Sequence, residues 1–161
     1  MKRLTTQFTL FIICPFCQLE KALRTKYGDD ILFITATAGV LDFSSDEISA
    51  IKDFIRREKV KNVCFVNDVS CNFIKEAILN EKEFGLHAEQ QLRKLVQNMN
   101  IKVNCVVSMD EMKKMVAGEN VQEQAKYLAS KKLFRQELST LEINIHTLIL
   151  NEKKQLIANL S

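Results

Sequence analysis

The chain has 161 residues, of which 47% are hydrophobic and 27% are charged, and its formal net charge is +3. A chain of this length folds as one domain whose core is large enough to need no disulfide staples. The small charge, spread without a basic stripe, excludes a nucleic-acid-binding protein. No apolar run reaches the roughly 20 residues of a membrane span.

Lys2 and Arg3 precede an apolar run at 8–13, which is the order found in a signal peptide. The run is short, however, has no small-residue cleavage site and passes directly into a helical pattern. The five cysteines are an odd number in a chain without a secretory signal. We therefore expect reduced thiols and a cytoplasmic location.

Short apolar runs and helical patterns alternate along the chain. The expected strands are 7–13, 31–35, 61–66, 101–107 and a terminal hairpin of 142–150 with 155–160. The expected helices are 19–27, one that begins with a Ser44–Glu47 capping box, 73–79, 86–96 and 121–138. This order predicts a single α/β domain over 1–161, with a mainly parallel central sheet flanked by helices and closed by a C-terminal hairpin.

Three cysteines follow two of these apolar runs. Cys14 and Cys17 come after the first run, and Cys71 comes shortly after the run at 61–66. Ligands of an open parallel sheet bind just past the carboxyl ends of its strands. The thiols therefore predict a metal site, a redox pair or a vestigial pocket with neutral thiols. Cys64 and Cys105 lie inside strand-like runs and are expected in the core.

Taken alone, Cys14-Pro-Phe-Cys17 resembles the thioredoxin and glutaredoxin motif. A helix N-terminus lowers the pKa of a thiol, so a dithiol redox protein using Cys14 and Cys17 is one alternative. That fold, however, places a cis-proline opposite the dithiol, and the only proline of this chain is Pro15, inside the motif.

A second resemblance covers residues 8–158 and rests on three motifs in order. They are Cys-Pro-Phe-Cys-Gln at 14–18, Ala-Thr-Ala-Gly at 36–39 and Asn-Asp-Val-Ser-Cys-Asn at 67–72. The helix opening at 120–124 and the strand pair at 146–150 and 154–157 add to it. In this order and spacing the chain resembles a diverged β-class carbonic anhydrase.

The resemblance implies a zinc site, and it also implies that the catalytic residues beside that site have been replaced. The family's two Cys and one His ligands fall on Cys14, Cys71 and Asp68, with Cys17 as a possible fourth ligand. Its Asp–Arg pair falls on Phe16 and Gln18, which leaves no catalytic residue to assign. We therefore expect a carbonic anhydrase-like protein that can still bind zinc but lacks efficient CO₂ hydration.

Two enzyme alternatives stay open: an atypical but true carbonic anhydrase, and another zinc-dependent lyase or hydrolase with an unidentified small-molecule substrate. The resemblance also implies a homodimer, here without the family's long N-terminal helical arm, because the chain begins close to its first expected strand. His87 and His146 have no motif partner and are expected to be surface or core residues.

Overall fold

The computed structural model describes residues 8–99 and 107–160. These residues form one five-stranded sheet in the order β2-β1-β3-β4-β5. The strands are β1 (Thr9–Ile13), β2 (Leu32–Thr35), β3 (Asn62–Asp68), β4 (Asn144–Leu150) and β5 (Leu156–Asn159). All neighbours are parallel except β4 and β5, which form the antiparallel hairpin. The α/β class, the mainly parallel sheet and the terminal hairpin expected from the sequence are thus confirmed.

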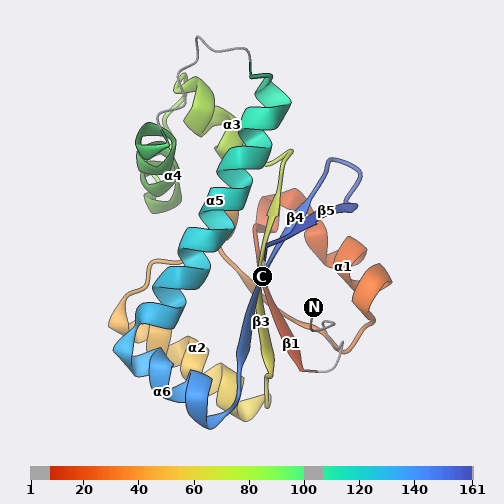
Figure 1. Ribbon diagram of the computed structural model, residues 1–161, viewed down its shortest axis with the longest axis vertical. Coiled ribbons are helices and arrows are strands. Elements are labelled where there is room, and N and C mark those ends of the chain that lie inside the picture. Colours follow the sequence, from red (N-terminus) through yellow and green to blue (C-terminus); the bar gives the residue numbers. More distant parts are fainter. Residues whose placement is uncertain (1–7, 100–106, 161) are drawn as a thin grey trace.

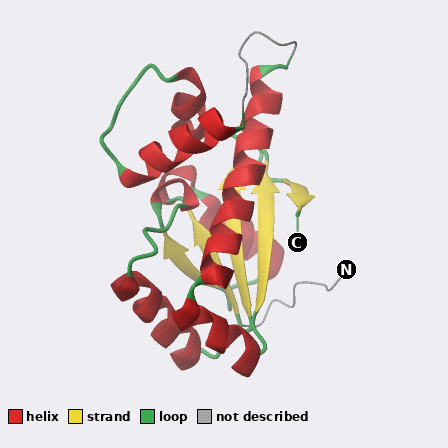
Figure 2. Ribbon diagram, turned by 60° about the vertical axis from the view of Figure 1, so that its left-hand side comes forward, coloured by secondary structure: helices red, strands yellow, loops and turns green. Residues whose placement is uncertain are grey.

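Helices cover both faces of the sheet (Figures 1 and 2). Their bounds are η1 (Pro15–Cys17), α1 (Leu19–Tyr27), η2 (Thr37–Gly39), α2 (Ser45–Arg57), α3 (Asn72–Leu79), α4 (His87–Asn98), α5 (Met109–Ser130) and α6 (Lys132–Thr140). In Figure 1, α1 lies on one side of the sheet, and α2, α5 and α6 lie on the other. None of the helices in the described ranges is long and apolar enough to cross a membrane.

Strands β1 and β3 lie at the centre of the hydrophobic core. Every residue of β1 and of β3 is buried, as expected for strands covered on both faces. Phe11 and Phe65 are among the largest fully buried side chains. Burying a side chain of this size contributes about 1.5–3 kcal/mol, so these strands form a stable scaffold for the loops at their ends. Cys64 lies in β3 and is buried in this core, as expected from the sequence.

Two helix boundaries differ from those the sequence predicts. The helix expected at 121–138 is two helices, because Lys131 takes an extended backbone (φ −66°, ψ 124°) between α5 and α6. The first of them starts earlier, at a capping box in which Ser108 and Glu111 bond reciprocally. The strand expected at 101–107 and the core cysteine at 105 lie, apart from Val107, outside the described residues.

The capping box expected at Ser44 is only half formed. The Ser44 hydroxyl accepts a hydrogen bond from the Glu47 backbone N–H at 3.2 Å. The Glu47 carboxylate, however, accepts from the N–H of Phe43, one residue before the cap, at 2.7 Å. Phe43 has a left-handed backbone (φ 56°), and this turn points its N–H at the carboxylate in place of the N–H of Ser44.

Candidate metal centre

The candidate site lies where β1 and β3 end. Cys14 directly follows β1 and opens η1, while Cys71 lies between β3 and α3. The two strands are parallel neighbours, with Ile12 opposite Phe65. Their carboxyl ends therefore meet at the same edge of the sheet, which is where open α/β sheets bind ligands.

The turn after β1 brings its two thiols to the same place. Pro15 is the first residue of η1, where its missing N–H costs no hydrogen bond. The Cys17 N–H donates to the Cys14 carbonyl at 3.3 Å. Gln18 then takes a left-handed backbone (φ 52°), which ends η1 and starts α1. This tight reversal keeps Cys17 beside Cys14.

Cys14, Cys17 and Cys71 form a compact cluster of thiols. Their sulfur atoms all lie within 4.8 Å of one another, and the three residues are 1%, 8% and 2% exposed. Tetrahedral zinc with Zn–S bonds of about 2.3 Å needs sulfur atoms about 3.8 Å apart. Three buried sulfur atoms within 4.8 Å of one another are therefore close enough to share a thiolate-bound metal ion.

The thiols determine each other's protonation. Hydrogen bonds from Cys17 and then Cys71 hold the pKa of the Cys14 thiol well below its ordinary value. The same contacts with Cys14 raise the pKa of Cys17 and of Cys71, and burial raises both further. These directions favour a thiolate on Cys14 beside two protonated thiols, which a bound divalent cation would deprotonate.

A buried polar network supports Cys14 from the neighbouring turn. Backbone hydrogen bonds, including one from Ala38 in η2, help to lower the pKa of Cys14. The Ala38 carbonyl accepts hydrogen bonds from the side chains of Asn67 (2.8 Å) and Asn120 (3.1 Å). Asn120 also donates to Asn67 at 2.7 Å. Residues from β3 and α5 thus fix the turn that faces the thiolate.

Asp68, expected as a ligand, has other partners in this structure. One of its oxygens accepts hydrogen bonds from the backbone N–H and the hydroxyl of Ser70, at 2.7 and 2.6 Å. The other oxygen forms an ion pair with the ammonium group of Lys154. The group of ligand atoms that lie within 4.8 Å of one another contains the three thiols and does not include this carboxylate.

Phe16 and Gln18, where the sequence resemblance would put an Asp–Arg pair, lie beside the thiols in this structure. Phe16 is 69% exposed and its ring packs against Phe73, with centroids 5.6 Å apart, which in turn contacts Phe84. The three rings, with Cys17 and Cys71, line a pocket of about 330 Å³. The entrance to the thiol cluster is therefore aromatic and carries no acid–base group at these two positions.

The remaining titratable candidates lie away from the cluster. Cys64 is buried in β3, where desolvation raises the pKa of its thiol. His146 is buried in β4, with its Nε2 3.1 Å from the Asn62 side-chain oxygen, and His87 is on the surface. Lys154, which contacts Asp68, is the neighbour that sequence reasoning missed, because nothing local indicates that a hairpin turn reaches back to β3.

Known structures show what this arrangement is similar to. The β-carbonic anhydrase CafA of Aspergillus fumigatus is 22% identical, with a TM-score of 0.79, over 98% of this chain and 76% of that chain. A tetrameric β-carbonic anhydrase of Sordaria macrospora is 16% identical, with a TM-score of 0.78, over 98% and 82%. The Coccomyxa β-carbonic anhydrase, in complex with acetazolamide, is 12% identical, with a TM-score of 0.76, over 97% and 72%.

Sequence comparison alone finds no relative: no protein-family model matches the chain, and no curated protein matches it. The structural likenesses, at 12–22% identity, concern the fold. They bear out the resemblance drawn from the three motifs. The chain has a diverged form of the β-carbonic anhydrase fold, with a cluster of three cysteines that can bind a metal at the carboxyl edge of its sheet.

Proposed function

We propose that this protein binds zinc through Cys14, Cys17 and Cys71 and lacks efficient CO₂ hydration. The observation that carries the proposal is the mutual approach of three buried sulfur atoms within 4.8 Å. The proposal leaves Asp68 out of the ligand set, because both of its oxygens already have partners in Ser70 and Lys154.

The donor set and its neighbours argue against efficient hydration. Catalytic zinc works by lowering the pKa of a bound water in an open position. Three thiolates carry more negative charge than a divalent cation carries positive charge. They therefore lower the pKa of a zinc-bound water less than a ligand set that includes a neutral imidazole. Phe16 cannot accept a proton, and Gln18 carries no charge to orient bicarbonate.

Metal content and cobalt substitution test the ligand set. We expect close to one zinc per purified chain, and thiolate-to-cobalt charge-transfer absorption after exchange with Co²⁺. Cys17→Ser should weaken this absorption, whereas Cys64→Ala, which removes a buried thiol outside the cluster, should leave it unchanged. A protein that contains only a trace of metal and binds no cobalt would overturn the metal proposal.

A stopped-flow hydration assay on the zinc-loaded protein tests the loss of activity. We expect a rate near that of a buffer control. Turnover comparable to that of a carbonic anhydrase, abolished by Cys71→Ser, would instead establish the atypical-enzyme alternative. If another lyase or hydrolase reaction is present, the same variant should abolish it too, since the reaction would depend on the same metal.

A dithiol redox function is the second candidate. It is favoured by the depressed pKa of Cys14, which follows from the hydrogen bond that Cys17 donates. This candidate requires a Cys14–Cys17 disulfide that a thioredoxin system reduces. Ordinary titration of both thiols, together with unchanged thiol–disulfide exchange in Cys14→Ser, would remove it.

For partners, we propose a homodimer. Support comes from the similarity to a Sordaria macrospora enzyme described as tetrameric, which makes self-association a reasonable arrangement for this fold. Multi-angle light scattering measures the stoichiometry directly. A reduced, cytoplasmic environment stays a prediction from the cysteine content, and it agrees with four described cysteines being free thiols.

A further inference from the structure

A second pocket, separate from the thiol cluster, opens between α1 and the turn that leads into β5. Its volume is about 730 Å³, which is within the range of sites for small molecules. Its lining comprises Gln18, Lys21, Ala22, Thr25, Lys26, Lys153, Lys154, Gln155 and Leu156. It shares only Gln18 and Lys154 with the aromatic pocket above the thiols.

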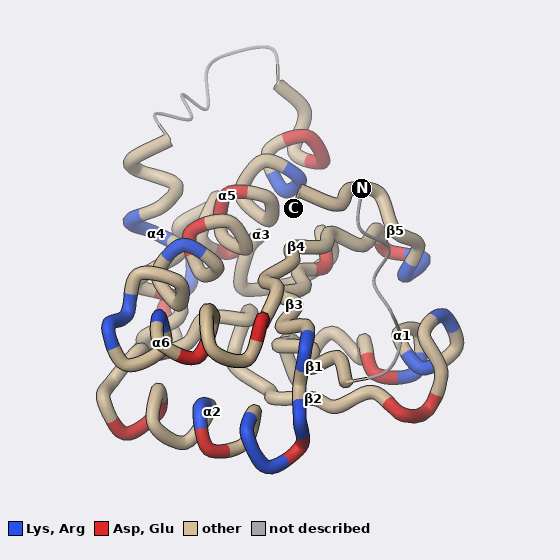
Figure 3. Tube along the Cα trace, turned by 60° about the horizontal axis from the view of Figure 1, so that its bottom comes forward, with Lys and Arg blue, Asp and Glu red and all other residues tan. Residues whose placement is uncertain are grey.

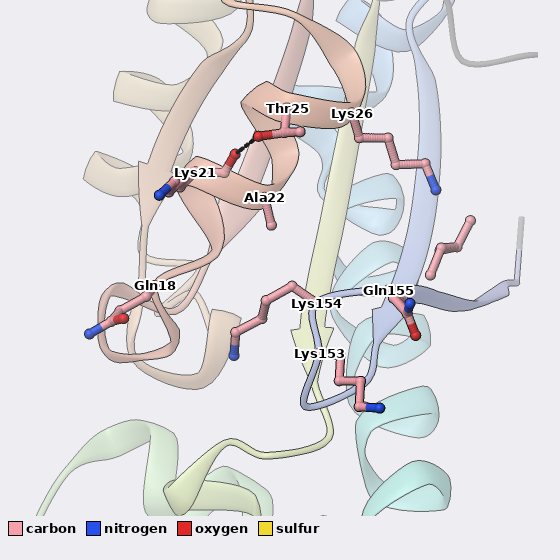
Figure 4. A pocket seen from close by; sticks show the side chains of 9 residues that line it. Gln18, Lys21, Ala22, Thr25, Lys26, Lys153, Lys154 and Gln155 are labelled. Carbon is pink, nitrogen blue, oxygen red and sulfur yellow. Dashed lines mark hydrogen bonds between the residues drawn. The ribbon is translucent and has the colours of Figure 1, made fainter.

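The pocket is lined by four lysines and by no acidic residue. In Figure 4, Lys26 extends from α1 toward the hairpin, and Lys154 reaches from the hairpin toward Gln18. Figure 3 shows basic positions on α1 and on the segment beside β5 at the same side of the molecule. Lysines from two distant segments of the chain therefore line one hollow.

Most of this charge is uncompensated. Lys154 is paired with Asp68, whereas the other three lysines have no ion pair with a carboxylate among residues 8–99 and 107–160. Glu152, in the same turn, lines a different pocket together with Asp110. Three lysines along one cavity, with no carboxylate among its lining residues, give it a positive potential that a bound anion would lower.

We propose that this pocket binds a small phosphate-bearing anion. Lysine ammonium groups recognise phosphate as point charges, and a doubly charged phosphate matches three free cations better than a single carboxylate does. The amide groups of Gln18 and Gln155 add hydrogen-bond donors, while Ala22 and Leu156 give an apolar wall for an organic part of the ligand. The proposal does not depend on a metal at the thiol cluster.

Isothermal titration of the full chain with inorganic pyrophosphate, at low salt, tests the proposal. We expect one site per chain, with binding that weakens as salt rises because exposed charges are screened. The double variant Lys21→Gln/Lys153→Gln should weaken binding by about fourfold to 25-fold, from about twofold to fivefold per lysine. The matched control, Lys94→Gln/Lys132→Gln, removes the same charge from α4 and α6 and should bind as the unaltered protein does.

Titration with ADP distinguishes the two sources of the phosphate. Tighter binding of ADP than of pyrophosphate would assign an organic phosphate, and tighter binding of pyrophosphate would assign the inorganic ion. Absence of binding for both probes would overturn the proposal, as would equal weakening by the control double variant. Circular dichroism of each variant shows that the fold is retained, and zinc content, measured in parallel, reports on the thiol cluster separately.

Discussion

Two buried carboxylates, Asp68 and Glu137, each form an ion pair with a cation from a distant part of the chain. Both carboxylates are almost inaccessible, with side chains 0% and 3% exposed, while their partners Lys154 and Arg56 are 28% and 55% exposed. Glu137 joins α6 to α2, where Arg56 donates to both of its oxygens. Asp68 instead lies at the end of β3, three residues before the metal-ligand candidate Cys71.

The comparison shows that an ion pair takes its role from what surrounds it. The Arg56–Glu137 pair holds two helices together at the end of the molecule away from α3 (Figure 1). Lys154 of the second pair lines both the pocket at the thiols and the lysine-lined pocket. Similar changes in the two pairs should therefore cost similar stability, but only changes in the second should alter ligand binding.

The largest difference between the two regions should appear in the pH dependence of zinc affinity. Because the pKa values of Cys17 and Cys71 are raised, both thiols are protonated near neutral pH and must release their protons on binding. Affinity should therefore increase with pH, by about 100-fold per unit between about pH 6 and 8. Competition with a chromophoric chelator at several pH values measures the slope.

Glu137→Gln is the control variant. It should leave the pH dependence of zinc affinity unchanged, since the ion pair of Glu137 is remote from the thiols. A zinc affinity that does not change with pH would contradict the assignment of two protonated thiols in the metal-free cluster.

Removal of the cation should have the next largest effect, in both regions. Lys154→Gln and Arg56→Gln each leave a buried carboxylate without its partner, so each should lower the free energy of unfolding by about 2 kcal/mol. Urea denaturation measures the loss. Adding Asp68→Asn to Lys154→Gln should restore part of the lost free energy of unfolding, because the double variant no longer buries an unpaired charge. If the double variant is instead less stable than Lys154→Gln, the hydrogen bonds from Ser70 are sufficient to stabilise the carboxylate.

Neutralising the carboxylates should have the smallest effect on stability and the most selective effect on binding. Asp68→Asn and Glu137→Gln leave a partly exposed cation that water can solvate, so each should cost about 1 kcal/mol. Only Asp68→Asn should weaken zinc binding, by about tenfold, as expected for a residue that positions the ligands without binding the metal. Zinc competition on both variants measures this.

If Asp68→Asn instead weakened zinc binding as much as Cys71→Ser does, Asp68 would be a ligand, as the sequence comparison implies. Equal weakening by Glu137→Gln would mean that general destabilisation, not position beside the thiols, causes the loss.

Local patterns were sufficient for most of the secondary structure and failed where a distant contact decides. The apolar runs predicted β1 and β3 because buried parallel strands are continuously hydrophobic. The break at Lys131 between α5 and α6 has no proline or glycine to signal it. Gly118 lies within α5, although helix propensity disfavours glycine there. A Cβ at this position would lie 3.3 Å from the Ile149 side chain in β4, so close packing of α5 on the sheet explains the glycine.

The sequence by itself determined that Cys14, Cys17 and Cys71 share one edge of the sheet, because parallel strands end on the same side and each cysteine follows a strand end closely. It also determined, through three motifs, the β-carbonic anhydrase-like fold. Tertiary structure alone decided that Lys154 pairs with Asp68, 86 residues away, and that lysines of α1 and of the last turn line one pocket. Such contacts depend on how a hairpin packs against a distant strand and helix, and no local spacing encodes that.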